Sequence, residues 1–405
     1  MILSCKLYSN YIYIIMSYEY VYYNALINNI DSKSDDTFTH EPNLVFNEQK
    51  PDPIIKNCED YEYAIESFKL DLKTLPVIIP TIKYDETNTN YHDTIYKVTA
   101  EITYQNVLYS YSQRVEFNPQ DKTAVLPTMK NGFADYSTGY YNVYNYEWFI
   151  TLVNKALRLA VYKLKTEVIP GLIPDTISDY SPYFTFDKGT KLISLFAPRV
   201  DFDENNAAPM SICLNKALYR LFNSLPLQIK TETSVTLIDG VIGQSDPQQV
   251  MKINMKNFYL SNSVKLYTCP KLDGTIYEST SVSIEYLYVY QDYTTFDSWS
   301  PVESICINSN TIPVYKSLVS ANHTYYNGIE DTTGSLNVYE LSITDFKAGS
   351  YEGGILYSPN EKRWMNLNQQ EELKNINISV FYRSKLTGSL IPVQLNSGGS
   401  ASFKK

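Results

Sequence analysis

The sequence has little of the chemistry on which most enzymes rely. Only three of its 405 residues are histidines, and they lie far apart in the chain at His40, His92 and His323. Histidine is the usual proton carrier near neutral pH, and nothing around these positions indicates a catalytic triad. The 15 glycines form neither the GxGxxG nor the GxxxxGKS/T loop that binds nucleotide phosphates. We therefore expect a non-enzymatic protein without a cofactor.

Cysteine and long apolar runs are also scarce. The five cysteines are irregularly spaced and lack a CxxC pair: Cys5, Cys58, Cys213, Cys269 and Cys306. This spacing argues against a disulfide framework or a zinc site and predicts folding in a reducing compartment. No stretch approaches the ~20 consecutive apolar residues that span a bilayer, so we expect no transmembrane segment. The apolar run before Met16 lacks the flanks of a signal peptide, and Met16 could equally be the start of translation.

Basic residues are outnumbered, with 34 Lys and Arg against 44 Asp and Glu, which gives a net charge of −10. Neither end of the chain carries a basic run, so direct nucleic-acid binding is not expected. The densest acidic cluster is Asp201, Asp203 and Glu204, whose oxygens could hold a calcium ion. The cluster lacks the full calcium-loop pattern, so we interpret it as a solvated polar loop and expect no metal. A hydrolase that uses Asp201 and Asp203 ranks last among the functions considered.

Tyrosine is abundant, with 38 residues beside 16 phenylalanines and 3 tryptophans. A genome rich in A+T codons would explain part of this excess. The tyrosine ring nevertheless suits half-buried strand faces, and its hydroxyl can remain hydrated at an interface. The tyrosine-rich segment before the long helix therefore supplies candidate interface residues, namely Tyr140, Tyr141 and Tyr144. Aromatic residues of this segment could alternatively stack on sugar rings.

Most of the periodic segments predict strands. Apolar residues alternate with polar ones from Tyr96 to Tyr104, which places Lys97, Thr99, Glu101 and Thr103 toward water, and the run 107–117 predicts an antiparallel neighbour. One long helix is predicted over residues 145–166 and a shorter one over 214–223. The long helix carries Lys155, Arg158, Lys163 and Lys165, which we interpret as a solvated face rather than a phosphate-binding surface.

Three regions follow from this pattern. Residues 1–60 are expected to form an N-terminal arm that becomes ordered only on assembly, because residues 31–60 lack a periodic apolar face. Residues 61–226 are expected to form a β-rich domain that contains both helices. Residues 227–405 are expected to form a C-terminal β-sandwich, because alternating strands are separated there by turn-forming pairs such as Asp239-Gly240, Asp273-Gly274 and Asn327-Gly328.

Three stretches carry a resemblance to a known class: SFKLDLKTLPVIIPTI, YYNVYNYEWFITLVNKALRLA and NISVFYRSKLTGSLIPVQL. They are an early strand that enters a Leu-Pro corner, a tyrosine-rich loop that enters a helix, and a closing strand pair. Their order over residues 61–405 resembles the jelly-roll capsid proteins of non-tailed DNA viruses, in the adenovirus, virophage and polinton lineage. The resemblance implies a mainly β fold of antiparallel sandwiches, either a double jelly roll or one roll with a mixed α+β half.

The resemblance also implies a function. The expected protein is a capsid subunit that is synthesised in the host cytoplasm, self-assembles through tyrosine-rich surfaces and joins other capsid proteins in the virion. The resemblance supplies no active-site residues. The alternative is a receptor- or glycan-binding spike, which would also be β-rich and acidic, and which aromatic residues converging in one pocket would favour.

Overall fold

The computed structural model divides the chain into two compact units. Unit 1 comprises residues 1–77, 136–139 and 301–405, and unit 2 comprises residues 78–135 and 140–300. The structure describes residues 2–5, 21–22, 24–28, 44–70, 75–83, 92–105, 107–120, 141–168, 177–231, 236–238, 241–243, 249–253, 259–260, 268–278, 285–313, 324–326, 329–331, 336–342, 355–357, 364–368, 372–385, 388–393 and 400–404.

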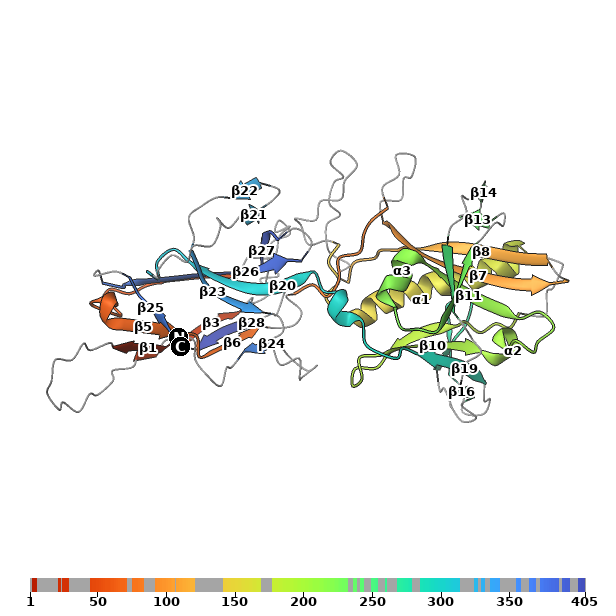
Figure 1. The fold of residues 1–405 in the computed structure, drawn as a ribbon, viewed down its shortest axis with the longest axis horizontal. Coiled ribbons are helices and arrows are strands. Elements are labelled where there is room, and N and C mark those ends of the chain that lie inside the picture. Colours follow the sequence, from red (N-terminus) through yellow and green to blue (C-terminus); the bar gives the residue numbers. More distant parts are fainter. Residues whose placement is uncertain are drawn as a thin grey trace. The chain divides into compact units, whose positions relative to one another are not determined.

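Unit 1 is a β-sandwich (Figure 1). One layer is a seven-stranded sheet made of β4 (Val45–Gln49), β20 (Val302–Ser309), β21 (Thr324–Tyr326), β22 (Ile329–Asp331), β23 (Leu336–Ser342), β26 (Asn375–Ser384) and β27 (Leu390–Pro392). The other layer contains two four-stranded sheets. The first is made of β1 (Ile2–Cys5), β2 (Val21–Tyr22), β5 (Tyr61–Ala64) and β25 (Met365–Asn366). The second is made of β3 (Asn24–Asn28), β6 (Ser67–Leu70), β24 (Ile355–Tyr357) and β28 (Ser400–Lys404).

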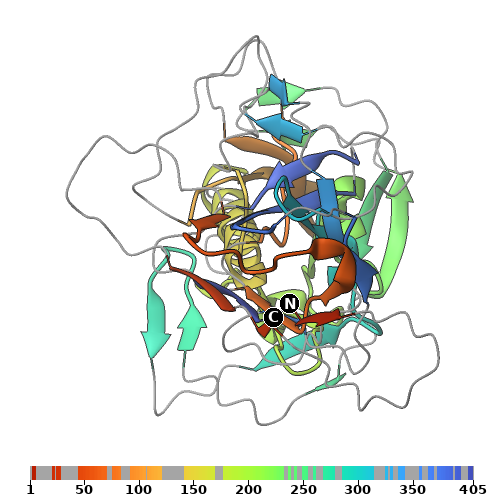
Figure 2. The same ribbon diagram turned by 90° about the vertical axis from the view of Figure 1, so that its left-hand side faces the viewer.

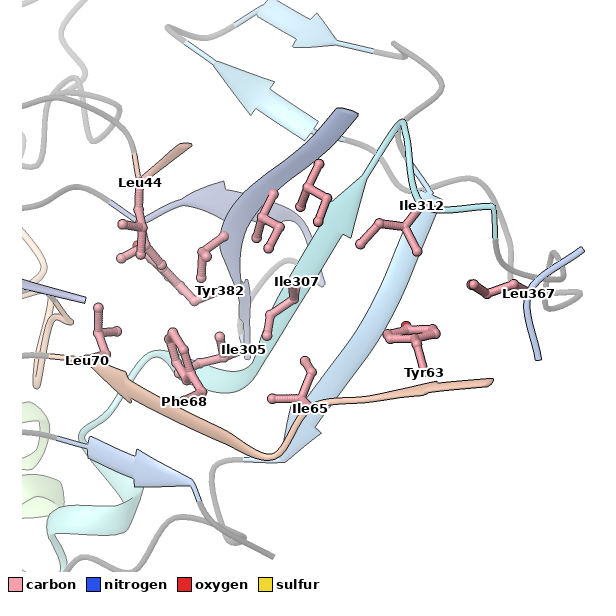
Figure 3. Close-up of a cluster of buried hydrophobic side chains, with 14 of the residues drawn as sticks. Leu44, Tyr63, Ile65, Phe68, Leu70, Ile305, Ile307, Ile312, Leu367 and Tyr382 are labelled. Atoms are coloured by element: carbon pink, nitrogen blue, oxygen red, sulfur yellow. The ribbon is translucent and has the colours of Figure 1, made fainter. Parts of the chain in front are cut away.

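The core of unit 1 lies between these layers. β5 and β6 contribute Tyr63 and Phe68, and β20 contributes Ile305, all of them 0 % exposed. Figure 3 shows these side chains beside Ile307 and Tyr382. Ile305, Ile307 and Tyr382 belong to the seven-stranded sheet, which faces β5 and β6. β5 and β6 belong to different four-stranded sheets, so the chain passes from one sheet to the other between Ala64 and Ser67. Strands from the two ends of the chain meet here, because β28 pairs with both β3 and β6 (Figure 2).

The predicted N-terminal arm is wrong for its described part. β4 pairs with β26 over five registered positions, and Leu44 and Ile55 are 1 % and 2 % exposed. A short 3₁₀ turn at Cys58–Asp60 leads directly into β5. The apolar residues in this polar stretch are too irregularly spaced to form a local period, but Leu44, Ile55 and Cys58 belong to the core of the sandwich. Residues 1, 6–20, 23 and 29–43 of the predicted arm lie outside the described residues.

Unit 2 has a helix between two sheets (Figure 1). Its seven-stranded sheet is made of β7 (Asp93–Tyr104), β8 (Val107–Glu116), β11 (Met210–Asn215), β12 (Leu227–Thr231), β13 (Thr236–Ile238), β14 (Val241–Gly243) and β15 (Gln249–Ile253). A four-stranded sheet is made of β9 (Tyr183–Phe186), β10 (Ile193–Pro198), β16 (Tyr259–Leu260) and β19 (Tyr286–Tyr290). β17 (Thr268–Pro270) and β18 (Ile276–Glu278) form a separate hairpin.

The central helix α1 (Tyr146–Lys163) confirms the predicted long helix and continues into a π-helical turn at Leu164–Val168. It begins where the Asn145 side chain accepts a hydrogen bond from the backbone N–H of Glu147, at 2.8 Å, which satisfies an otherwise open donor. The Phe149 ring packs edge-on against Tyr96 of β7 at 5.5 Å. The Asn154 amide exchanges two hydrogen bonds with the backbone of Phe184 in β9. These contacts fix the helix to both sheets.

Unit 2 also confirms the predicted β7–β8 hairpin and corrects two local predictions. The second helix, α3 (Lys216–Leu221), is shorter than predicted, because residues up to Asn215 extend β11. Two further short helical segments are α2 (Arg199–Phe202) and a 3₁₀ turn at Phe296–Ser298. Thr99 and Glu101 were expected to face water but are 2 % and 1 % exposed. Both lie on β7, the middle strand of a seven-stranded sheet, and their neighbours on the side facing away from the helix, Ser112 and Ser211, are buried as well.

The predicted boundary between residues 226 and 227 does not match the two units. β12, which begins at Leu227, pairs with β15, and β15 pairs with β11, so strands on both sides of the boundary belong to one sheet. The early strands β5 and β6 instead pair with β25, β24 and β28 near the end of the chain. The mainly β, antiparallel fold class is confirmed, and of the two predicted alternatives the structure has one sandwich with one mixed α+β unit.

Candidate functional site

One face of the β9–β10–β19 sheet in unit 2 is lined by aromatic side chains. We call this the aromatic face, and its members are Tyr183, Phe196, Tyr286, Tyr288 and Tyr290. Strand alternation produces it, since Leu195 and Val289 point to the helix side and are 0 % and 4 % exposed. The rings on the other side are progressively more accessible along β19, from Tyr286 at 2 % to Tyr290 at 40 % exposed.

Neighbouring rings are nearly parallel for four members of the aromatic face, Tyr183, Phe196, Tyr288 and Tyr290, whereas Tyr286 meets Tyr183 edge-on at 72°. Strand pairing sets Phe196 directly opposite Tyr183 on one side and Tyr288 on the other. The ring centroids lie 5.4 Å apart for Tyr183 and Phe196 and 5.7 Å apart for Phe196 and Tyr288, with interplanar angles of 13° and 26°. Tyr290 continues the series 6.5 Å beyond Tyr288. Stacked aromatic pairs contribute about 0.5–1.5 kcal/mol beyond their buried area, so the sheet holds these half-exposed rings in a fixed arrangement.

The three tyrosines predicted for an interface fall in different places. Tyr141 is 1 % exposed and its ring packs 5.4 Å from Phe117, so this residue belongs to the core of unit 2 and its prediction as an interface residue is wrong. Tyr144 is half-buried, and its hydroxyl accepts a hydrogen bond from Asn142 at 3.4 Å. Its place in an interface stays a prediction. Tyr140 lies outside the described residues.

Sequence reasoning missed the aromatic face, although the alternation of Tyr286, Tyr288 and Tyr290 was visible. That alternation shows that three rings share one side of a strand. It does not show which strands are neighbours, and β9 and β19 are far apart in the sequence. The missing information was therefore the pairing of β10 with both of them.

The acidic cluster is not assembled into a cation site. Asp201 is 3 % exposed and accepts hydrogen bonds from both the backbone N–H and the hydroxyl of Ser178. Burial raises the pKa of the Asp201 carboxyl above its ordinary value. Asp203 instead pairs with Arg199 at 3.1 Å and accepts bonds from Asn205, which lower its pKa. Asp201 and Asp203 thus bind different partners, and Glu204 is exposed.

The cationic residues of α1 are each engaged within unit 2. Lys155 pairs with Glu116 at 3.1 Å, and Lys163 pairs with Glu167 at 3.5 Å. Other contacts reach neighbouring loops, namely Arg158 with the Leu272 carbonyl at 2.8 Å and Lys165 with Asp179 at 2.8 Å. The sequence predicted a solvated face, and Lys155 and Lys163 are partly exposed, but all four side chains also have partners within unit 2.

Unit 1 contains an ion pair that spans β20. Arg383 of β26 donates to both carboxylate oxygens of Glu340 in β23, at 2.9 and 3.3 Å, and Ser304 of the intervening β20 donates to the same carboxylate. The Arg383 guanidinium lowers the pKa of Glu340. Cys306 lies beside the pair and is 0 % exposed, and burial raises the pKa of its thiol to about 12. A thiol that stays protonated is a poor nucleophile, so this cluster is structural.

The described residues offer little for catalysis. In this part of the chain, no group of three or more His, Cys, Asp or Glu side chains is arranged to hold a metal ion. His92 is the only histidine within it, and burial lowers its pKa. Three described cysteines, Cys58, Cys213 and Cys306, are buried free thiols. None of the helices that the structure describes has the length and apolar character required to span a bilayer.

The sheets of the described residues are mainly antiparallel, and one of them presents a row of aromatic rings, which defines a β-sheet protein without an assembled catalytic site in this part of the chain. Comparison with known proteins shows the family to which the chain belongs. The family model of the Sputnik minor capsid protein V18/19 matches residues 21–405. The chain is also 30 % identical over 128 residues to the uncharacterized protein V18 of the Sputnik virophage, an alignment that covers 31 % of this chain and 74 % of that protein.

A solved structure agrees in fold. The chain is similar to one in the 3.5 Å cryo-electron-microscopy structure of the Sputnik virophage, with a TM-score of 0.62 and 21 % identity over 95 % of this chain and 97 % of the other. The mavirus penton protein matches with a TM-score of 0.48 and 15 % identity over 95 % and 98 % of the two chains. The chain belongs to the Sputnik minor capsid protein V18/19 family. It is a structural virion protein of the virophage lineage, which confirms the predicted class.

Proposed function

We propose that the chain is a minor capsid subunit that self-assembles and joins other capsid proteins through the aromatic face of unit 2. The half-exposed, nearly parallel rings of Tyr183, Phe196, Tyr288 and Tyr290 carry this proposal. Interface cores are enriched in tyrosine and depleted in charge, because a tyrosine buries a large ring while its hydroxyl finds a partner. Since the sheet already fixes the rings, less side-chain freedom is lost on association.

The same proposal makes the subunit non-catalytic and without direct contact to the genome. The engaged cations of α1 and the net charge of −10 support the second point. Synthesis in the reducing host cytoplasm is supported by the free thiols of Cys58, Cys213 and Cys306.

The test compares two variants of the full chain. Tyr288→Ser combined with Tyr290→Ser removes two rings of the aromatic face, whereas Tyr162→Ser removes a ring that is 41 % exposed on α1 and serves as the matched control. Sedimentation velocity and light scattering measure association of each chain alone and with the other capsid proteins. Loss of two anchoring rings should weaken association about tenfold or more, and the control should associate like the wild type.

Equal association of both variants would place the assembly surface elsewhere. A wild-type chain that stays monomeric under all conditions, with and without the other capsid proteins, would contradict the shell function and favour the receptor- or glycan-binding alternative.

A further inference from the structure

His92 lies where four segments of unit 2 meet. It immediately precedes β7, and its carbonyl accepts a hydrogen bond from the backbone N–H of Phe117 at the end of β8, at 2.8 Å. Its ring lies 6.5 Å from that of Tyr141, which in turn lies 5.4 Å from the Phe117 ring. Tyr141 and Phe117 are 1 % and 2 % exposed, so the half-buried imidazole borders an apolar aromatic cluster.

The fourth segment, residues 78–83, is the part of the chain that enters unit 2. Ile78 exchanges backbone hydrogen bonds with Val143, at 3.3 and 2.9 Å, two residues beyond Tyr141. Lys83 donates to the Asp93 carbonyl at 2.6 Å, next to His92. The entering segment is therefore held at one end by the isolated bridge to Val143 and at the other by β7, the strand that follows His92.

A charge on the His92 ring would face two carboxylates. Asp93 is its neighbour in β7 and Glu116 lies at the end of β8, where Lys155 of α1 pairs with Glu116 at 3.1 Å. Both carboxylates raise the pKa of His92, but the larger effect is burial, which lowers it below the ordinary value of 6.5. The folded protein therefore favours the neutral ring, and this preference removes stability as the pH falls through 6.5, because the unfolded chain then binds the proton more readily.

We propose that His92 is an acid-sensitive latch, whose protonation loosens the attachment of residues 78–83 and 141–143 to the β7–β8 hairpin. Burial against the Tyr141 and Phe117 rings disfavours a charge on the imidazole, and opening of this aromatic cluster would let water solvate the charged ring. Loosening is confined to these segments, because β7 and β8 pair without interruption from Lys97 opposite Arg114 to the hairpin turn. This latch is independent of the aromatic face and does not rest on the proposed assembly function.

Hydrogen–deuterium exchange of the full chain tests the latch between about pH 7.5 and about pH 5.5, a range in which histidine is the side chain that normally titrates. After correction for intrinsic exchange, protection of the amides of Ile78 and Val143 should fall about threefold or more on acidification in the wild type. The fall should be absent in His92→Gln. The matched control replaces the other two histidines, as His40→Gln with His323→Gln, and should respond like the wild type.

A second variant keeps the test decisive if His92→Gln does not fold. Glu116→Gln removes a carboxylate that raises the pKa of His92, so the acid transition should move to lower pH. The latch is overturned if wild-type protection is unchanged by acid, if the control variant abolishes the response, or if Glu116→Gln leaves the transition at the same pH.

Discussion

At the scale of single residues, two tyrosines of unit 2 have opposite surroundings. Tyr141 is 1 % exposed against Phe117, whereas Tyr290 is 40 % exposed on the aromatic face. Tyr141→Ser should lower the free energy of unfolding by about 3–5 kcal/mol, because it leaves a cavity where a large ring was buried. Tyr290→Ser should change the free energy of unfolding by about 1 kcal/mol or less.

Urea denaturation of the monomeric variants, followed by tryptophan fluorescence, measures both values. A Tyr141→Ser protein as stable as the wild type but defective in association would restore the interface role that the sequence predicted for this residue. Equal loss of stability in both variants would show instead that Tyr290 is a core residue.

Single residues also show what a pattern can and cannot predict. Alternation in β7 correctly placed Val98 and Ala100 in the core, both 0 % exposed. It failed for Glu101, which accepts a hydrogen bond from Ser211 of the neighbouring β11 at 3.3 Å. A period of two identifies the side chains that share a face, but whether the second face is covered depends on distant segments.

At the scale of elements, α1 is capped at its N-terminus by Asn145, which is the first residue of the helix predicted from the sequence. Asn145→Ala should lower the free energy of unfolding by about 1 kcal/mol, because the backbone N–H of Glu147 loses its side-chain acceptor. Asn145→Asp is the matched control and should remain near the wild type, since aspartate is an equally good cap and its charge favours a helix N-terminus. Thermal unfolding compares the two, and equal destabilisation by both would indicate that the asparagine amide, rather than its cap oxygen, matters.

Elements were predictable where their signals are local. The long helix follows from apolar spacing over its own residues, and the β7–β8 hairpin follows from two adjacent alternating runs. The predicted start of α3 was too early, because Leu214 fits the apolar stripe of the helix. In the structure Leu214 belongs to β11 and lies opposite Val98 in β7 and Met251 in β15. Tertiary pairing decided this boundary, and no local pattern records it.

At the scale of the whole molecule, the chain is built as one unit inserted into another. Unit 1 forms from both ends of the chain, and unit 2 forms from the segment between them. A prediction that reads domains as consecutive ranges cannot find this arrangement, because the partners of β6 are β24 and β28 near the end of the chain. The class of protein was nevertheless accessible, since it depends on the mainly β pattern and on the resemblance at the closing strands.

The insertion predicts which fragments of the chain fold alone. Residues 78–300 contain every described strand of both sheets of unit 2, so this fragment should unfold cooperatively and show circular dichroism of a mixed helix and strand protein. Residues 227–405, the predicted C-terminal sandwich, lack β11 as the partner of β15, and they lack β5 and β6 as partners of β25, β24 and β28. Open sheet edges and half of a core would remain exposed, so this fragment should aggregate or melt without a cooperative transition. A cooperative, β-rich 227–405 fragment together with an unfolded 78–300 fragment would mean that the consecutive division of the chain is the one that folds.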